Sequence, residues 1–210
     1  MDVHPVHHAP LTWRDFFLQL LMITIGLFIA LTLQAAVESL HHRHLVRDAR
    51  ENLRHEIQTN QQRYAENLEN LQKNRRQLAN DIDLLKDLRA GKAIEKGALS
   101  WRWDWNSYSE ASWKTARDTG AVSYMSSELI NAYTEVYTQQ QYVNAEAVGI
   151  IDDEPKSAAA LRVANDPSAL SPTDIQAMLI SLAETDIRLA TVQSLMESLD
   201  EMYTKAIKTL

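Results

Sequence analysis

The sequence lacks cysteine and is poor in glycine and proline. Without cysteine, the chain can form no disulfide bond, no thiolate metal site and no cysteine nucleophile. Its 210 residues include only five glycines and five prolines, which argues against sheet-and-turn architectures and against disorder. The length of the chain is that of one domain, or of one domain with an appendage. We expect the fold to be all-α.

Positive charge is also scarce. Lysine and arginine total 21 against 28 for aspartate and glutamate, which gives a net charge of −7. Because a surface that neutralises phosphates must be basic, we expect no binding of nucleic acid.

Catalytic motifs are missing as well. The sequence contains no Gly-rich phosphate loop, G-x-S-x-G elbow, H-E-x-x-H motif or nucleotide-binding fingerprint. No histidine follows His55, so a second Glu-x-x-His for a di-iron bundle is absent. We expect a protein that is not an enzyme and uses no cofactor. The weak candidates for a metal site are Glu38, His41 and His44, since Glu38 and His41 share a helix face.

What the sequence does contain is one long uncharged stretch, residues 16–37. As a helix these 22 residues would span about 33 Å, enough for a hydrocarbon core of about 30 Å. Trp13 lies at one edge, where interfacial aromatics are common. A cleaved signal peptide would have a shorter apolar stretch and a basic start. The sequence therefore predicts a single transmembrane helix after a short polar tail, residues 1–15.

Four residues of this stretch are candidate contacts with another membrane protein. Gly26 and Ala30 form a small-xxx-small pair that lets a second helix approach closely. Gln19 and Gln34 are polar groups that would favour a hydrogen-bonding partner in lipid. The alternative is that a single-pass helix tolerates a few such residues without a partner.

Basic residues follow the predicted span. Arg43 and Arg47 are candidates for contact with anionic lipid or with an acidic partner surface. The alternative is a solvated face balanced by local pairs, such as Arg47 with Glu51. Counting basic residues alone places the C-terminal domain on the cytoplasmic side, but acidic residues interleave with them and leave the orientation open.

Residues 38–90 are predicted to form a long helix that ends at Gly91. Apolar residues recur every seven positions: Ile57, Tyr64, Leu71, Leu78 and Leu85. Beside them runs a polar column, Asn60, Asn67, Asn74 and Asp81. This pattern predicts a helix packed along one seam and partly solvated along the other.

A Trp-rich connection, residues 91–108, follows. Trp101, Trp103 and Trp105 alternate, which places their indoles on one side of an extended segment. Together with Trp113 they could form a platform for a ligand (a sugar, a quinone or a peptide) or for a partner protein. The alternative is that large apolar side chains pin the connection against the helices.

The remainder is predicted to comprise helices within 109–152, a linker over 153–171 and a long helix over 172–208. Apolar residues recur along the last helix with a spacing of four and three, which predicts a long seam for helical partners. An antiparallel bundle of three or four helices outside the membrane would satisfy both long helices. A parallel coiled-coil homodimer is the competing arrangement.

Several short stretches carry a resemblance: Trp13 to Phe16, Ile23 to Leu31, Val37-Glu38, His41 to Arg43, Leu53 to Asn60 and Trp113 to Ala121. In these the chain resembles an uncharacterised group of bacterial single-pass membrane proteins with an N-terminal anchor and a helical extramembrane domain. The resemblance implies a bacterial inner membrane and a periplasmic C-terminal domain. It implies no activity.

We therefore expect a non-enzymatic accessory or scaffolding subunit that binds and stabilises a larger inner-membrane complex. Its partners would be the lipid bilayer and other integral membrane proteins. The alternative is a ligand-sensing periplasmic bundle with a Trp-lined pocket that works through a separate transducer.

Overall fold

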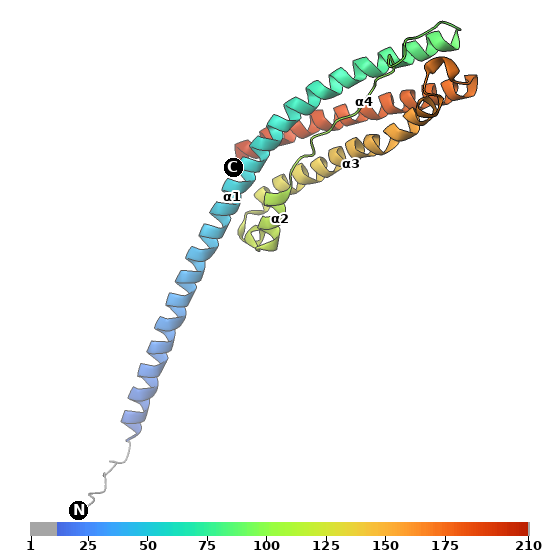
Figure 1. Ribbon diagram of the computed structural model, residues 1–210. Coiled ribbons are helices and arrows are strands. Elements are labelled where there is room, and N and C mark those ends of the chain that lie inside the picture. The colour runs from blue at the N-terminus through green and yellow to red at the C-terminus, as the bar shows by residue number, and fades with distance from the viewer. Residues whose placement is uncertain (1–11, 210) are drawn as a thin grey trace, which may run out of the picture. The chain divides into compact units, whose positions relative to one another are not determined.

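The computed structural model describes residues 12–209, and within them the side chains of all but residues 152–157 and 209. The polar tail predicted for residues 1–15 thus lies mostly outside the described residues. Over residues 12–209 the chain is helical and contains no β-strand, which confirms the all-α prediction. In order, the helices are α1 (Trp13–Arg89), α2 (Ala111–Asp118), η1 (Ala121–Tyr124), α3 (Ser127–Ala164), η2 (Pro167–Ala169) and α4 (Pro172–Thr209) (Figure 1).

The chain divides into two compact units, Met1–Arg47 and Asp48–Leu210. The 77-residue helix α1 contributes to both of them. It begins with a capping box, in which the Asp15 amide donates to Thr12 Oγ1 (3.3 Å) and Thr12 donates back to the Asp15 carboxylate. It ends before Gly91, whose φ of +80° is a left-handed conformation that glycine adopts without strain, as predicted.

Within the second unit, hydrogen bonds define the directions of the three long helices. Arg75 of α1 bonds Asp186 and Gln193, and Arg89 bonds Gln176, so α1 and α4 run antiparallel. In contrast, α1 and α3 run parallel, since Glu56 bonds Tyr137 and Asn60 bonds Gln140. α3 and α4 lie side by side (Figure 1), and Gln139 donates to the Leu195 carbonyl between them.

The predicted apolar seams form the core of this unit. Ile57, Leu71, Leu78 and Leu85 of α1 are fully buried. The four-three positions of α4 are buried from Met178 through Ala206, and only Leu210 of that predicted seam lies outside the described residues. Each Å² of apolar surface that is buried contributes about 25 cal/mol to the stability of the fold. These seams are therefore the main stabilising contribution to the second unit.

The connecting segment, residues 91–110, returns along α1 from the end of that helix to α2 (Figure 1). Its main chain is hydrogen-bonded to side chains of α1 at Ser100, Asn106 and Ser109. Since the segment is extended, it follows α1 from Asp81 back to Asn60 with far fewer residues than a helix would need.

One predicted boundary differs. A linker was expected over residues 153–171, but α3 continues to Ala164. The stop signal is Asn165, which has a left-handed φ of 60° and donates its amide to the Leu161 carbonyl (2.9 Å). Asp166 and Pro167 follow directly, so the helix ends there, and the acidic residues around position 153 do not interrupt it.

Candidate functional site

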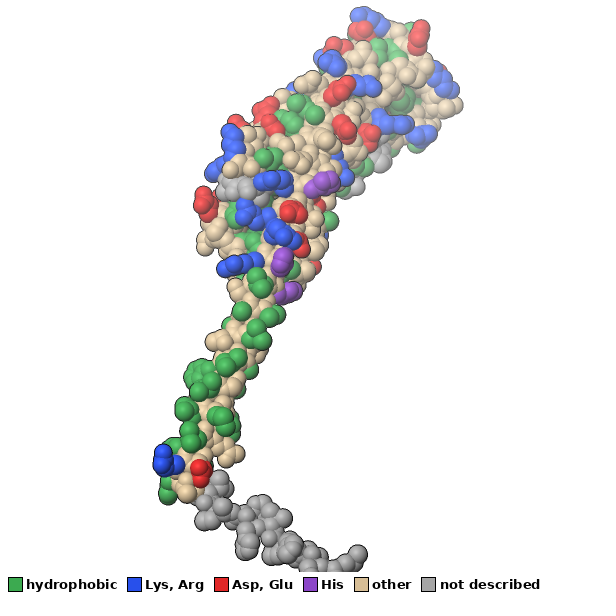
Figure 2. Space-filling view, turned by 90° about the vertical axis from the view of Figure 1, so that its left-hand side faces the viewer, with side chains coloured by type: hydrophobic (Ala, Val, Ile, Leu, Met, Phe, Trp, Pro, Cys, Tyr) green, Lys and Arg blue, Asp and Glu red, His purple; other side chains and the backbone are tan. Residues whose placement is uncertain are grey.

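The uncharged stretch of α1, residues 16–37 (the anchor segment), is exposed along its whole length. Its apolar side chains present between about half and seven tenths of their surface, for example Leu20 (48%) and Met22 (70%). The helix is long and apolar enough to cross a membrane, and none of its apolar window is buried. A core helix of a soluble protein would be mostly buried, so the exposure favours a transmembrane anchor (Figure 2).

The four predicted contact residues of the anchor segment share one face. Gln19, Gly26, Ala30 and Gln34 are separated by seven, four and four positions. At about 100° per residue, these spacings place all four within an arc of about 80°. A Cβ atom added at Gly26 would meet no atom within 4 Å, so the surface there is open to a second helix.

The glutamines of this face differ from the nearby threonines in their hydrogen bonding. Thr24 donates to the Leu20 carbonyl (2.8 Å) and Thr32 to the Ile29 carbonyl (2.9 Å), so their hydroxyls are satisfied within α1. The side-chain amides of Gln19 and Gln34 make no hydrogen bond to any described residue. In a bilayer those amides need a partner from another molecule.

The residues after the anchor segment do not assemble a metal site. Among the described residues there is no group of three or more histidine, aspartate and glutamate side chains placed to hold a metal ion. Glu38 instead lies 4.0 Å from His42, one turn further along, and the His41 ring lies next to the His42 ring. The candidates Glu38, His41 and His44 therefore gain no support from the geometry.

Arg43 and Arg47, the candidates for lipid or acidic-partner contact, are both exposed. They lie one turn apart on α1, which places their guanidinium groups on the same side of the helix. This arrangement is compatible with contact to lipid phosphates as well as with a solvated face.

The four tryptophans predicted as a binding platform are mostly packed inside the second unit. Trp103, Trp105 and Trp113 are 4%, 9% and 7% exposed, and Trp101 is half-buried. The Trp103 and Trp105 rings stack at 5.8 Å, as their alternation predicted, and Trp113 stacks on Tyr137 at 5.5 Å. Indoles that are buried this deeply offer no face on which a ligand could stack.

The indole N–H groups support the packing interpretation. Trp103 Nε1 donates to the Ala147 carbonyl (2.7 Å) and Trp105 Nε1 donates to Asn144 Oδ1 (3.2 Å). Trp101 Nε1 is buried without a partner among the described residues. The connecting segment is therefore held to α3 by hydrogen bonds, and Trp113 of α2 is held to α3 by a ring contact, so these tryptophans pin the chain against the helices.

The polar column of α1 was predicted to be partly solvated, but three of its four residues are buried and only Asn74 is half-buried. Asn60 and Asn67 are fully buried and Asp81 is 2% exposed. Asn67 accepts from the Asn106 amide (3.1 Å) and donates to its carbonyl (2.8 Å), and Asn60 pairs in the same way with Ser109. Asp81 accepts from the amides of Ser100 and Trp101. The column therefore holds the connecting segment.

The heptad spacing of this column matches the geometry of an extended chain. Seven helical residues rise about 10.5 Å, and three extended residues span about 10 Å. Asn60 and Asn67 are thus in register with Ser109 and Asn106, three residues apart. The sequence shows this column as asparagines that recur every seven residues. Their role in binding the main chain could be interpreted only once the connecting segment was known to be their partner.

Glu56 of α1 fixes the start of α2. Its carboxylate accepts from Ser109 Oγ (2.7 Å), from the Ser112 amide (2.9 Å) and from Tyr137 Oη (2.8 Å). A carboxylate at a helix N-terminus is favourable because the first amides of the helix lack partners. Burial raises the pKa of Tyr137 above its ordinary value, and the adjacent Glu56 charge raises it further. Sequence reasoning did not identify this cluster.

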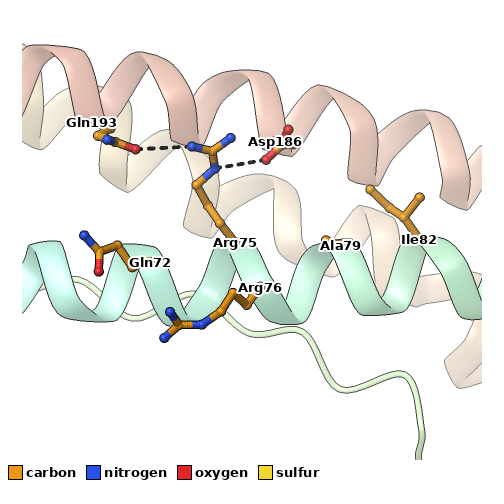
Figure 3. A pocket seen from close by; sticks show the side chains of 7 residues that line it. All are labelled: Gln72, Arg75, Arg76, Ala79, Ile82, Asp186 and Gln193. Carbon is orange, nitrogen blue, oxygen red and sulfur yellow. Dashed lines mark hydrogen bonds and ion pairs between the residues drawn. The ribbon is translucent and has the colours of Figure 1, made fainter.

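Two hollows flank α1 in the second unit. One lies between α1 and α4 and is lined by Gln72, Arg75, Arg76, Ala79, Ile82, Asp186 and Gln193 (Figure 3). Arg75 crosses it, since its guanidinium donates to Asp186 Oδ1 and to Gln193 Oε1, both at 3.2 Å. The other lies between α1 and the connecting segment and is lined by polar and charged side chains.

Comparison of the chain with protein-family models, with curated proteins and with solved structures finds no match.

Proposed function

We propose that this protein is a membrane-anchored, non-enzymatic accessory or scaffolding subunit of a larger inner-membrane complex. In this proposal residues 16–37 cross the bilayer once, and residues 48–209 stand outside it, on the periplasmic side, as a helical bundle in which α4 runs antiparallel to α1 and α3. The bundle carries surfaces for partner proteins, and the anchor segment binds a second transmembrane helix.

The observation that carries the proposal is the face of α1 formed by Gln19, Gly26, Ala30 and Gln34. Its glutamine amides have no partner among the described residues, whereas the threonine hydroxyls of the same segment are satisfied internally. Small residues between the two glutamines allow the close backbone approach that interhelical hydrogen bonds need. A second transmembrane helix would supply both the packing and the missing hydrogen bonds.

A second copy of the chain could supply that helix as well as a different protein could. The exposed guanidinium groups of Arg43 and Arg47 would then contact lipid phosphates or an acidic partner beside the membrane. The sensor alternative receives less support, because the tryptophans that would line its pocket are mostly buried and hydrogen-bonded.

The test is to solubilise the tagged full chain from native membranes in mild detergent, size the particle and identify the proteins that travel with it. We expect a discrete complex of defined composition. The paired change Gln19→Leu and Gln34→Leu should weaken recovery of the partner about tenfold, since each interhelical hydrogen bond contributes about 0.6–1 kcal/mol.

The matched control is Thr24→Val with Thr32→Val, which removes two polar groups that already have partners within α1. This control should leave partner recovery unchanged. A bare monomer or homodimer from native membranes would overturn the proposal, and equal loss in both paired variants would remove the assigned role of the glutamines.

A further inference from the structure

The hollow between α1 and the connecting segment is a polar groove. Its volume, about 770 Å³, lies within the range of roughly 300–1,000 Å³ that is common for ligand sites. One wall is α1 and the other is the extended segment. Its lining residues are Asn70, Lys73, Asn74, Arg76, Gln77, Asn80, Ser100, Arg102 and Asp104.

The groove lies where the contacts of the polar column are interrupted. Asn67 holds Asn106 and Asp81 holds Ser100, but Asn74, midway between them, donates to the Asn70 carbonyl of its own helix (2.8 Å). Arg102 and Asp104 of the connecting segment also line the groove, and their main-chain amides and carbonyls make no hydrogen bond to any described residue. One contact in an otherwise regular series is therefore missing, and polar groups remain on both walls.

The same column demonstrates what its amides bind. Asn60 and Asn67 each use both atoms of the side-chain amide on the main chain of one extended residue. Asn74 is the next asparagine of this heptad series, so a side-chain amide of the same kind lines the groove. An extended peptide entering there could pair its main chain with the side-chain amide of Asn74, as Asn106 does with Asn67.

The charges of the groove define which peptide would fit. Lys73, Arg76 and Arg102 make no ion pair with any residue whose side chain is described, and Asp104 is the one acidic lining residue. The contrast with Arg75 is direct: Arg75 points toward α4 and pairs with Asp186, whereas Arg76 points away from α4 (Figure 3). In a chain of net charge −7, three unpaired cations around one hollow favour an acidic ligand.

We propose that this polar groove binds an extended, acidic peptide segment of a partner protein. The main chain of that peptide pairs with Asn74, and its carboxylates meet Lys73, Arg76 and Arg102. This inference deepens the proposed scaffolding function and rests on it, since it names the kind of segment that the partner offers.

The test uses the purified full chain in detergent micelles and a fluorescein-labelled peptide of five Asp-Gly repeats, followed by fluorescence anisotropy. We expect saturable binding. Combining Lys73→Gln, Arg76→Gln and Arg102→Gln should weaken it about tenfold, as three partly exposed ion pairs are lost. The control Lys86→Gln, Lys114→Gln and Arg117→Gln makes the same change in charge elsewhere and should alter the affinity less than about twofold.

Asn74→Ala should weaken the peptide about threefold to tenfold while leaving the binding of inorganic phosphate unchanged, because only the peptide has a main chain to pair with. Absence of saturable peptide binding, equal weakening by the two triple variants, or binding of an acidic oligosaccharide such as oligogalacturonate in place of the peptide would overturn the inference. If the chain binds the peptide but purifies from native membranes without partners, the peptide-binding role of the groove would be supported and the scaffolding function would be contradicted.

Discussion

The anchor segment and the second unit use the same helix, α1, in two different environments. Leu27 of the anchor segment is 58% exposed, whereas Leu71 of the same helix is fully buried against protein. In the second unit the surface that α1 offers is covered by α3, α4 and the connecting segment. In the anchor segment no described residue covers it.

The side-chain amides sharpen this comparison. Asn60 and Asn67 have both amide atoms satisfied by the connecting segment, while Gln19 and Gln34 have neither satisfied by a described residue. An amide withdrawn from water costs about 1–3 kcal/mol if left unpaired. The chain itself removes that cost in the second unit, and in a bilayer another molecule would have to remove it in the anchor segment.

The largest effect is expected from removing an indole of the packed segment. Trp105→Ala should lower the free energy of unfolding of the second unit by about 3–5 kcal/mol, because a large buried ring leaves a cavity. Urea denaturation of the full chain in detergent, followed by circular dichroism, measures this. Trp13→Ala, at a position 76% exposed, should leave that free energy unchanged. A loss below about 1 kcal/mol for Trp105→Ala would mean that the segment is not anchored as described.

The second-largest loss in the free energy of unfolding is expected from a change in the polar column. Asn67→Ala should cost about 2 kcal/mol, since it leaves the main chain of Asn106 unpaired in a buried site. Asn74→Ala is the matched control in the same column and should cost less than about 0.5 kcal/mol, because Asn74 bonds only within α1. The same denaturation assay compares them, and equal costs would contradict the assigned role of the column.

A pH effect of intermediate size should come from the buried tyrosines of the second unit. Burial raises the pKa of Tyr137 and of Tyr203 above the ordinary value of 10.0. Groups with a raised pKa contribute their full stability below pH 10 and lose it as the pH rises, because the unfolded chain then releases protons that the folded chain retains. Stability should therefore be constant to about pH 9.5 and then fall by about 1.4 kcal/mol per pH unit for each such tyrosine.

Denaturation midpoints measured between about pH 7 and pH 11.5 would reveal this fall. Tyr137→Phe should make the alkaline limb shallower, and a flat profile throughout would show that these hydroxyls ionise as freely in the folded chain as in the unfolded one.

The smallest effect is expected at Tyr133, whose hydroxyl is buried without a hydrogen-bonding partner among the described residues. Burial raises its pKa to about 12. Tyr133→Phe keeps the ring against Trp113 and removes an unsatisfied polar group, so it should be neutral or stabilising by up to about 1 kcal/mol. A clear loss of stability would mean that the hydroxyl has a partner in solution.

Local features of the fold were predictable because they depend on neighbouring residues. Ser126 and Ser171 cap their helices, each accepting a hydrogen bond from the amide three residues further on. Gly91 and Gly120 lie just past helix ends with left-handed φ values. The periodic apolar seam of α4 likewise identified its buried side without knowledge of its partners.

Features that depend on distant residues were not predictable. The polar column was expected to be partly solvated because Asn67 and its partner Asn106 are 39 positions apart and nothing local links them. For the tryptophans, the alternation showed that Trp103 and Trp105 share a side, but it could not show that α3 covers that side. By contrast, Gln19 and Gln34 could be identified from sequence because any polar group in an uncharged stretch is conspicuous.

The most direct test of the central claim is site-specific photo-crosslinking of the anchor segment in native membranes. A photoreactive residue is placed at Ala30, on the face with the glutamines, or at Phe28, about 160° away around the helix. We predict crosslinks to one defined membrane protein from Ala30 and none from Phe28. Equal crosslinking from both positions, or none from either, would contradict a specific partner helix and with it the scaffolding function.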